Sequence, residues 1–257
     1  MNNYKKNKKI LENSFNYNQD MEHDACGVGL VASTNGKKSR KIIDYGIEAL
    51  KAIWHRGAVD ADGKSGDGAG IQIEIAPEFF KEKILATGHS TDSDKRICVG
   101  MIFLPRTDYS KQEKCREIIE SALLEENYNI YGWRQVPINP NVLGKTADQN
   151  RPEIAQVMFK KNEKLETNDL ERDLFETRKK IEKVARESQL DDLYICSFSS
   201  RSIVYKGMFL AEMLSEFYPD LNDEKLTSRF AIFHQRYSTN TFPSWDLAQP
   251  FRTLAHN

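Results

Sequence analysis

Residues 24–30 read Asp24-Ala25-Cys26-Gly27-Val28-Gly29-Leu30, and the chain changes character at Cys26. Upstream, the first twenty residues are rich in lysine and asparagine and show no sustained apolar periodicity, which is typical of a disordered tail. Downstream, residues 26–33 have the pattern of a strand. The sequence therefore predicts a disordered tail over residues 1–25 and a folded domain over residues 26–257.

A cysteine at the first position of a domain has two interpretations. By residue statistics, a lone cysteine is a small apolar side chain that opens a buried strand. Alternatively, removal of residues 1–25 would give Cys26 a free α-amine with a pKa of roughly 8, close enough to its own thiol to act as a general base. Position alone favours the first interpretation.

Composition argues against several classes of function. The 257 residues carry 37 Lys and Arg against 38 Asp and Glu, so no global charge favours nucleic acid or anionic lipid. No stretch reaches the ~18 apolar residues of a membrane span, and the first residues lack the apolar core of a secretory signal. The four cysteines are too few and too dispersed for a disulfide scaffold or a zinc knuckle. We expect a cytoplasmic protein with reduced thiols and neither a nucleic-acid nor a membrane partner.

Apolar periodicity predicts strands and helices in alternation. Helices are expected over residues 39–54, 77–85, 110–126 and 169–186. Strands are expected over residues 26–33, 97–104, 131–138, 154–159 and 230–234, with a hairpin made of residues 193–199 and 203–205. Residues 55–70, rich in Gly and Asp, are expected to form a loop that leads into a strand at Ile71, Ile73 and Ile75. Because several strands follow one another through short turns, a layered α+β fold is predicted.

Three binding motifs in this glycine-rich loop fail on their spacing. The run from Gly57 to Ser65 ends like a phosphate-binding P-loop, but five residues instead of four separate its glycines. The run Gly66-Asp67-Gly68-Ala69-Gly70 lacks the third-glycine spacing of a dinucleotide fingerprint and precedes a strand instead of a helix. Asp60 and Asp62 begin like an EF-hand, but Lys64 and Ile71 stand where oxygen ligands belong. We therefore expect these glycines to form a tight loop near an active site.

Two further segments change which interpretation of Cys26 is favoured. They are His55-Arg56-Gly57 and residues 234–243, His234-Gln235-Arg236-Tyr237-Ser238-Thr239-Asn240-Thr241-Phe242-Pro243. Together with Leu254-Ala255-His256-Asn257, they resemble the class II glutamine amidotransferases. Longer stretches resemble, more narrowly, the glutaminase domain of the glutamate synthase large subunit: residues 61–68, Gly132-Trp133-Arg134 and residues 249–252. The resemblance implies the four-layer αββα sandwich of the N-terminal-nucleophile hydrolases, incomplete at the C-terminus.

The resemblance implies a role for five residues. Cys26 would attack the side-chain amide of glutamine, giving a γ-glutamyl thioester and ammonia, with its own α-amine as the base. Residues 1–25 would then be a propeptide. Arg236, assisted by Thr239, would bind the substrate α-carboxylate, and Asn257 would donate to the oxyanion. Arg56 would shape the pocket, although a structural contact that holds the glycine-rich loop is an alternative for it, as a surface ion pair is for Arg236.

The implied function is a glutaminase that supplies ammonia for the amination of 2-oxoglutarate. In the family a glycine follows Asn257 and completes the oxyanion hole, and a later aspartate holds the substrate amine, so we expect low activity from residues 1–257 alone. The other glutamate synthase domains would be partners, as would a reductase small subunit. FMN and an iron–sulfur cluster would belong to those domains, with no cofactor or metal in this segment. The alternatives are a class II amidotransferase with a sugar-phosphate, ribosyl-phosphate or aspartate acceptor, and an inactive fragment that binds glutamine.

Overall fold

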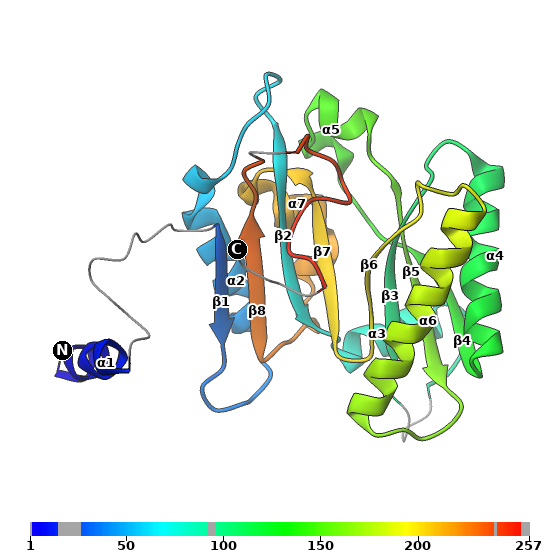
Figure 1. Ribbon diagram of the computed structural model, residues 1–257, viewed down its shortest axis with the longest axis horizontal. Coiled ribbons are helices and arrows are strands. Elements are labelled where there is room, and N and C mark those ends of the chain that lie inside the picture. The colour runs from blue at the N-terminus through cyan, green and yellow to red at the C-terminus, as the bar shows by residue number, and fades with distance from the viewer. Residues whose placement is uncertain (1, 15–26, 92–95, 239–240, 253–257) are drawn as a thin grey trace.

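The computed structural model describes residues 2–14, 27–91, 96–238 and 241–252. In this part of the chain, two antiparallel sheets have the strand orders β1-β8-β2-β7 and β4-β5-β3-β6 (Figure 1). The strands are β1 Val28–Ala32, β2 Ser65–Glu74, β3 Cys98–Leu104, β4 Tyr128–Gln135, β5 Glu153–Lys161, β6 Tyr194–Ser199, β7 Ser202–Phe209 and β8 Phe230–Gln235. The helices are α1 Asn2–Asn13, α2 Arg40–Ala52, α3 Pro77–Leu85, α4 Tyr109–Glu125, α5 Lys145–Gln149, α6 Thr167–Glu187 and α7 Leu214–Phe217, with short 3₁₀ turns at η1 Trp54–Arg56, η2 Pro140–Val142, η3 Ala211–Met213 and η4 Pro219–Asn222.

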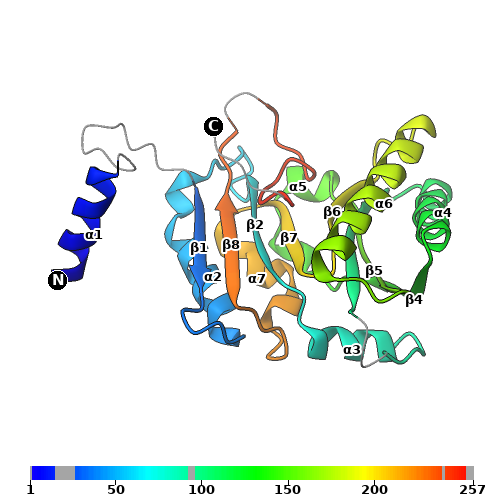
Figure 2. The ribbon, with the colours of Figure 1, turned by 60° about the horizontal axis from the view of Figure 1, so that its bottom comes forward.

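The sheets and helices form layers. Helix α2 packs on β1, β8 and β2, whereas α4 and α6 pack together and cover the other sheet (Figures 1 and 2). The sheets meet where β7 lies against β6 and β3. Alternation along β3 divides the interior, because Val99, Met101 and Phe103 join one apolar cluster while Cys98, Ile102 and Leu104 join the cluster under α4 and α6. The predicted α+β sandwich is therefore confirmed.

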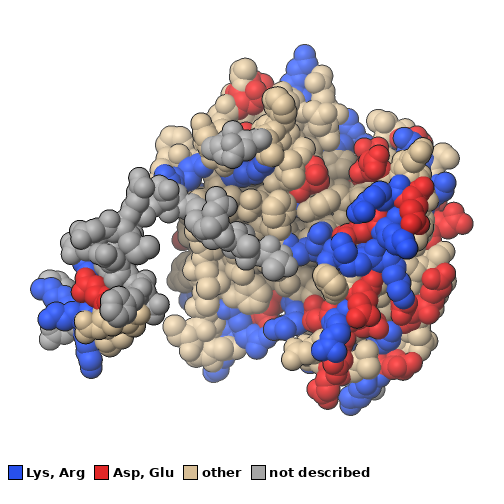
Figure 3. All heavy atoms as spheres, viewed as in Figure 1, with Lys and Arg blue, Asp and Glu red and all other residues tan. Residues whose placement is uncertain are grey.

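The long helices follow the sequence pattern. Ser39 caps α2 by accepting a hydrogen bond from the Lys41 backbone N, and the buried Ile43, Ile47 and Leu50 recur at helical spacing. Helix α6 buries Leu170, Leu174 and Ile181 in the same way. Its other side is charged, and Figure 3 shows basic and acidic side chains mixed over this part of the surface. None of the described helices has the length and apolar content needed to cross a membrane.

The predicted loop over residues 55–70 is wrong in its second half. Strand β2 begins at Ser65, and it pairs with β7 on one side and β8 on the other, so that Ala69 lies opposite both Gly207 and Gln235. Glycine has no side chain to show the period-two pattern of a strand, which hides this part of β2 from sequence analysis. Pairing on both edges from Ala69 to Ile73 compensates for the poor strand propensity of Gly70, and Gly66 forms an isolated bridge with Val59.

The predicted hairpin is also wrong. Strands β6 and β7 are consecutive, but β6 pairs with β3 in one sheet and β7 pairs with β2 in the other. The link of Ser200 and Arg201 thus passes from sheet to sheet. The carboxylate of Glu171 on α6 fixes this link, because it accepts hydrogen bonds from the Ser200 backbone N (2.7 Å) and from the Ser199 Oγ (2.8 Å).

Two smaller differences concern the N-terminus and the ends of β4, whereas α3 agrees with its prediction. Helix α1 occupies residues 2–13, within the region predicted as a disordered tail, and stands apart from the sheets in Figures 1 and 2. Strand β4 starts three residues earlier than predicted and ends before Pro137, which cannot donate to the ladder. Helix α3, opened by Pro77, has the predicted bounds.

A buried polar network connects the two sheets. Arg134 of β4 makes a bidentate contact with Asp220 of η4, with Nη1–Oδ2 and Nη2–Oδ1 distances of 2.8 and 2.5 Å. Arg134 Nη1 also donates to Gln156 of β5 (2.8 Å), whose amide reaches the Tyr205 hydroxyl of β7 (3.3 Å). Tyr205 in turn donates to Asp220 (3.3 Å), so the network closes on itself. Each member is satisfied by another, as a buried network requires.

Replacing Asp220 by alanine should lower the free energy of unfolding by about 3–5 kcal/mol, because Arg134 would remain buried without a counter-charge. Urea denaturation at neutral pH measures this change. Glu78→Ala is the matched control: it removes a carboxylate from the exposed pair with Lys81, which contributes at most about 1 kcal/mol. Equal losses in the two variants would contradict a structural role for the network.

Candidate functional site

The described part of the candidate site lies where β1 begins and β8 ends. Because the two strands are antiparallel, the Gly27 carbonyl accepts a hydrogen bond from the Gln235 backbone N at 2.6 Å, and Arg236 follows directly. Cys26 precedes Gly27 by one peptide bond but lies outside the described residues. Thr239 and Asn257 lie outside them too. Of the five predicted residues, only Arg236 and Arg56 lie within the described part of the chain.

The segment next to Cys26 is packed too closely for a side chain at position 27. A Cβ on Gly27 would lie 2.1 Å from the Gln235 carbonyl oxygen and 3.4 Å from the Arg56 Cβ. Arg56 belongs to the short turn η1 after α2. The structure thus brings Arg56 and Arg236, which are 180 residues apart in the chain, to the same end of the β1–β8 pair.

Arg236 is 7% exposed and is held by neutral groups. Its backbone N donates to the Gly68 carbonyl (2.8 Å), and its Nη2 and Nη1 donate to the Thr241 Oγ1 (2.6 Å) and the Asp67 carbonyl (3.4 Å). Among the described residues its guanidinium makes no ion pair, which excludes the surface-pair alternative within them. Burial lowers the pKa of Arg236, although Asp67 and Asp246 oppose the effect. A buried cation with N–H groups to spare suits a ligand carboxylate.

Several polar groups beside Arg236 were not predicted from the sequence. The Asp67 carboxylate accepts a hydrogen bond from the Ser238 backbone N, which ties the start of β2 to the segment after β8. The His234 Nδ1 and the Ser238 Oγ are buried atoms without a hydrogen-bond partner in the described structure. Such unsatisfied atoms are rare, and they are concentrated here on both sides of Arg236. The one sequence feature that could have indicated His234 and Ser238 is that both lie within residues 234–243, the segment that carries the family resemblance.

Gln235 explains the glycine of the His55-Arg56-Gly57 motif. Its buried side chain accepts from the Ala211 backbone N (2.8 Å) and donates to the Gly68 carbonyl (3.4 Å). A Cβ on Gly57 would lie 2.2 Å from the Gln235 Nε2, so a side chain there would displace Gln235 from its hydrogen bonds. Gln235 is therefore a scaffold residue that fixes the turn carrying Arg56.

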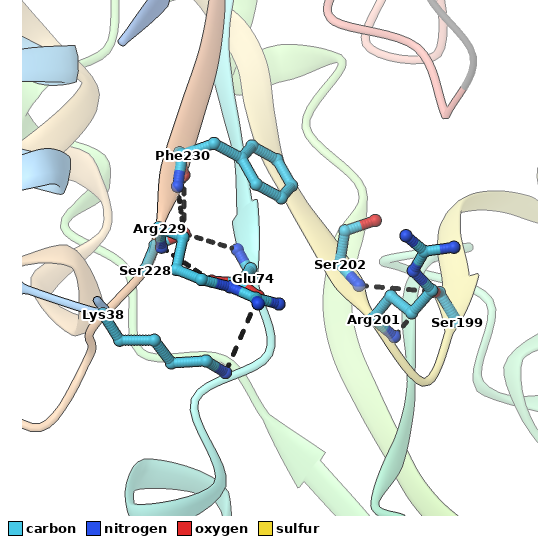
Figure 4. Close-up of polar contacts among 8 residues, drawn as sticks. All are labelled: Lys38, Glu74, Ser199, Arg201, Ser202, Ser228, Arg229 and Phe230. Carbon is cyan, nitrogen blue, oxygen red and sulfur yellow. Dashed lines mark hydrogen bonds and ion pairs between the residues drawn. The ribbon is translucent and has the colours of Figure 1, made fainter. Parts of the chain in front are cut away.

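Arg236 and Arg56 line neither of the two cavities found in the described structure. One, of about 810 Å³, lies at the opposite end of β2, where Glu74 accepts from the Arg229 Nε (2.9 Å) and pairs with Lys38 (3.7 Å; Figure 4). Burial acts to raise the pKa of Glu74, but its hydrogen bonds from Arg229 outweigh that effect and lower it. The other, of about 700 Å³, is lined by Tyr194 and Trp245 among others. These cavities do not mark the predicted site.

The comparisons with known proteins agree with one another. The family model of the class-II glutamine amidotransferases matches residues 26–257. The NADPH-dependent glutamate synthase large chain of Azospirillum brasilense is 54% identical over 254 residues, which cover 99% of this chain and 17% of that protein. The ferredoxin-dependent glutamate synthase of Pyropia yezoensis is 45% identical over 93% of this chain and 15% of its own length. Ferredoxin-dependent glutamate synthase 1 of Arabidopsis thaliana is 44% identical over 92% of this chain and 14% of its own length. The chain thus spans 14–17% of the length of these relatives.

The half-buried His234 should make the stability depend on pH. Burial and the charge of Arg236 lower the pKa of His234 from 6.5 to about 4 in the folded protein. Between these values only the unfolded chain takes up the proton, so the free energy of unfolding should fall as the pH drops from 6.5 towards 4. Urea denaturation at pH 7 and pH 5 should show a smaller fall for His234→Gln than for the parent chain. His89→Gln, at an exposed position, controls for the loss of a histidine, and an unchanged fall in His234→Gln would contradict the assignment.

Proposed function

Because the chain belongs to the class-II glutamine amidotransferases, we propose that it carries the glutaminase site of a glutamate synthase large chain. Cys26 is the nucleophile in this proposal, Arg236 and Thr239 bind the substrate α-carboxylate, Asn257 donates to the oxyanion and Arg56 shapes the pocket. The observation that carries the proposal is the environment of Arg236. It is a buried guanidinium without an ion pair in the described structure, beside the β1–β8 pair, whose first strand begins two residues after Cys26.

The reaction has two steps in this proposal. The Cys26 thiolate attacks the side-chain amide carbon of glutamine, and the Asn257 side-chain NH₂ donates to the oxygen that becomes negative. The α-amine of Cys26 passes the thiol proton to the amide nitrogen, so that the C–N bond breaks and ammonia leaves. Water then attacks the γ-glutamyl thioester, which releases glutamate and restores the thiol. Residues 1–25 act as a propeptide, because their removal is what frees the α-amine.

The ammonia would be used elsewhere in a longer protein, for the amination of 2-oxoglutarate. The names of the relatives favour this acceptor over a sugar phosphate, a ribosyl phosphate or aspartate. We assign FMN and an iron–sulfur cluster to other domains, with a reductase small subunit as a further partner. Cys115 and Cys196 support that assignment, because burial raises their pKa values to about 11 and about 12 and disfavours the thiolate that a cluster needs. The cytoplasmic location stays a prediction.

Diazo-oxo-norleucine, an electrophile that mimics glutamine, should label Cys26 in the natural full-length protein and should not label Cys26→Ala.

Arg236→Lys should raise the KM for glutamine roughly 10- to 100-fold, because a hydrogen bond to a charged group contributes about 1.5–3 kcal/mol. Arg172→Lys, at an exposed position on α6, is the matched control and should leave KM unchanged. Labelling that persists in Cys26→Ala would refute the nucleophile. Glutamine binding by calorimetry without ammonia release would favour the inactive alternative.

The mass of the purified protein tests the propeptide. A species that begins at Cys26 is expected, since only a free α-amine can serve as the base. The Cys26→Ala variant should keep residues 1–25 if the same thiol performs the cleavage. An active glutaminase with an intact N-terminus would overturn this part of the proposal.

A further inference from the structure

Residues 244–252, here called the C-terminal segment, lie directly on the backbone of β2 and β7. Figures 1 and 2 show this part of the chain, coloured red, crossing these strands. A Cβ on Gly70 would lie 2.7 Å from the Gln249 carbonyl oxygen, and one on Gly68 would lie 2.7 Å from the Ala248 Cβ. Glycines that the sequence predicted as a loop therefore form a flat surface on which the C-terminal segment rests.

Lys206 of β7 holds the C-terminal segment on this surface. The residue is 1% exposed, and its ammonium has three N–H donors and three acceptors. It donates to the carbonyl oxygens of Asp246 and Ala248, both at 2.7 Å, and to the Tyr194 hydroxyl at 3.0 Å. The rings of Tyr194 and Phe251 lie 4.5 and 4.9 Å from the nitrogen. Burial lowers the pKa of Lys206 to about 8, so the ammonium remains the main form at neutral pH.

Two other side chains anchor the ends of the C-terminal segment. The Trp245 Nε1 donates to the Ala147 carbonyl at 3.0 Å, and the ring is buried against Phe209 and Phe217. At the other end, Arg252 donates to the Ile195 carbonyl and pairs with Glu182 at 3.6 Å. Lys206 binds the middle of the segment, between these anchors.

The held segment is coupled to the Arg236 site. The Asp246 carboxylate raises the pKa of Arg236 against the effect of burial, so it is part of the electrostatic environment of that guanidinium. Gly68, which contacts Ala248, also accepts the hydrogen bond of the Arg236 backbone N. Asn257 follows Arg252 by five residues. The position of the C-terminal segment therefore limits where the chain can place Asn257.

We propose that Lys206 is a positioning residue for glutamine hydrolysis, which holds the C-terminal segment on Gly68 and Gly70 and thereby sets the position of the chain that leads to Asn257. The inference rests on the proposed glutaminase function. Lys206 does not touch the substrate in this scheme. Its loss affects the reaction through the alignment of the oxyanion donor, whereas the carboxylate contact of Arg236 is kept.

Lys206→Met tests this role in the natural full-length protein. We expect kcat for ammonia release to fall by about 10²-fold with a change in KM below about threefold, because a small misplacement costs turnover more than binding. Alkylation of Cys26 by iodoacetamide, which needs no oxyanion donor, should keep its rate. Chymotrypsin should cleave next to Trp245 and Phe251 faster than in the parent protein. Lys41→Met, at an exposed position of α2, is the control and should behave as the parent.

A second variant displaces the same segment by a different force. Ala248→Leu enlarges a buried side chain that lies against Gly68 and should reproduce the loss of kcat with Lys206 intact. If either variant frees the C-terminal segment for cleavage and kcat is unchanged, the positioning role is wrong. Unchanged cleavage in Lys206→Met would show that Lys206 does not hold the segment. A parent protein without glutaminase activity would instead refute the proposed function, and the cleavage assay would still report on the contact.

Discussion

Strand β2 is buried along its whole length, and the fold is arranged to satisfy that constraint. A buried strand must pair its backbone groups on both edges, and β7 and β8 supply those pairs. It must also be covered on both faces. Ile71 and Ile73 belong to the apolar cluster that includes α2, whereas Gly68 and Gly70 leave the other face to the C-terminal segment. Helix α2, strands β7 and β8 and the end of the described chain are thus all positioned by β2.

Sequence analysis succeeded where side chains carry a period. Apolar residues recur at regular spacing along α2, as at Ile43 and Leu50, and along α6, as at Leu174 and Ile181. The layered α+β class follows from such elements. It failed at Gly66 to Gly70, where side chains are missing, and at the link between β6 and β7, because sheet membership is decided by pairing with distant strands. A lysine in a strand indicates a solvent face, so Lys206 could not be recognised as buried without the segment that covers it.

The candidate site is electrostatically unusual because it keeps two buried cations close enough to influence each other. Burial is the main cause of the lowered pKa of Lys206, and the charges of Arg252 and Arg236 add to it, while the carboxylates of Asp67 and Asp246 partly compensate the charge of Arg236. A substrate carboxylate would complete that compensation. Residue types alone did not single out Arg236 and Arg56. The two residues were predicted through the family resemblance. Their convergence at Gly27 depends on the antiparallel pairing of β1 with β8, which a local pattern does not encode.

The crossing from β6 to β7 has a mechanical consequence. Two residues join the sheets, one of them is bonded to Glu171 of α6, and the Arg134–Asp220 network connects the sheets a second time. A hinge needs a few residues that are free to change their dihedral angles, and this link offers almost no such freedom. The two sheets should therefore move as one rigid body. Any opening or closing that accompanies ligand exchange must take place in the chain segments laid over the sandwich, while the sandwich keeps its shape.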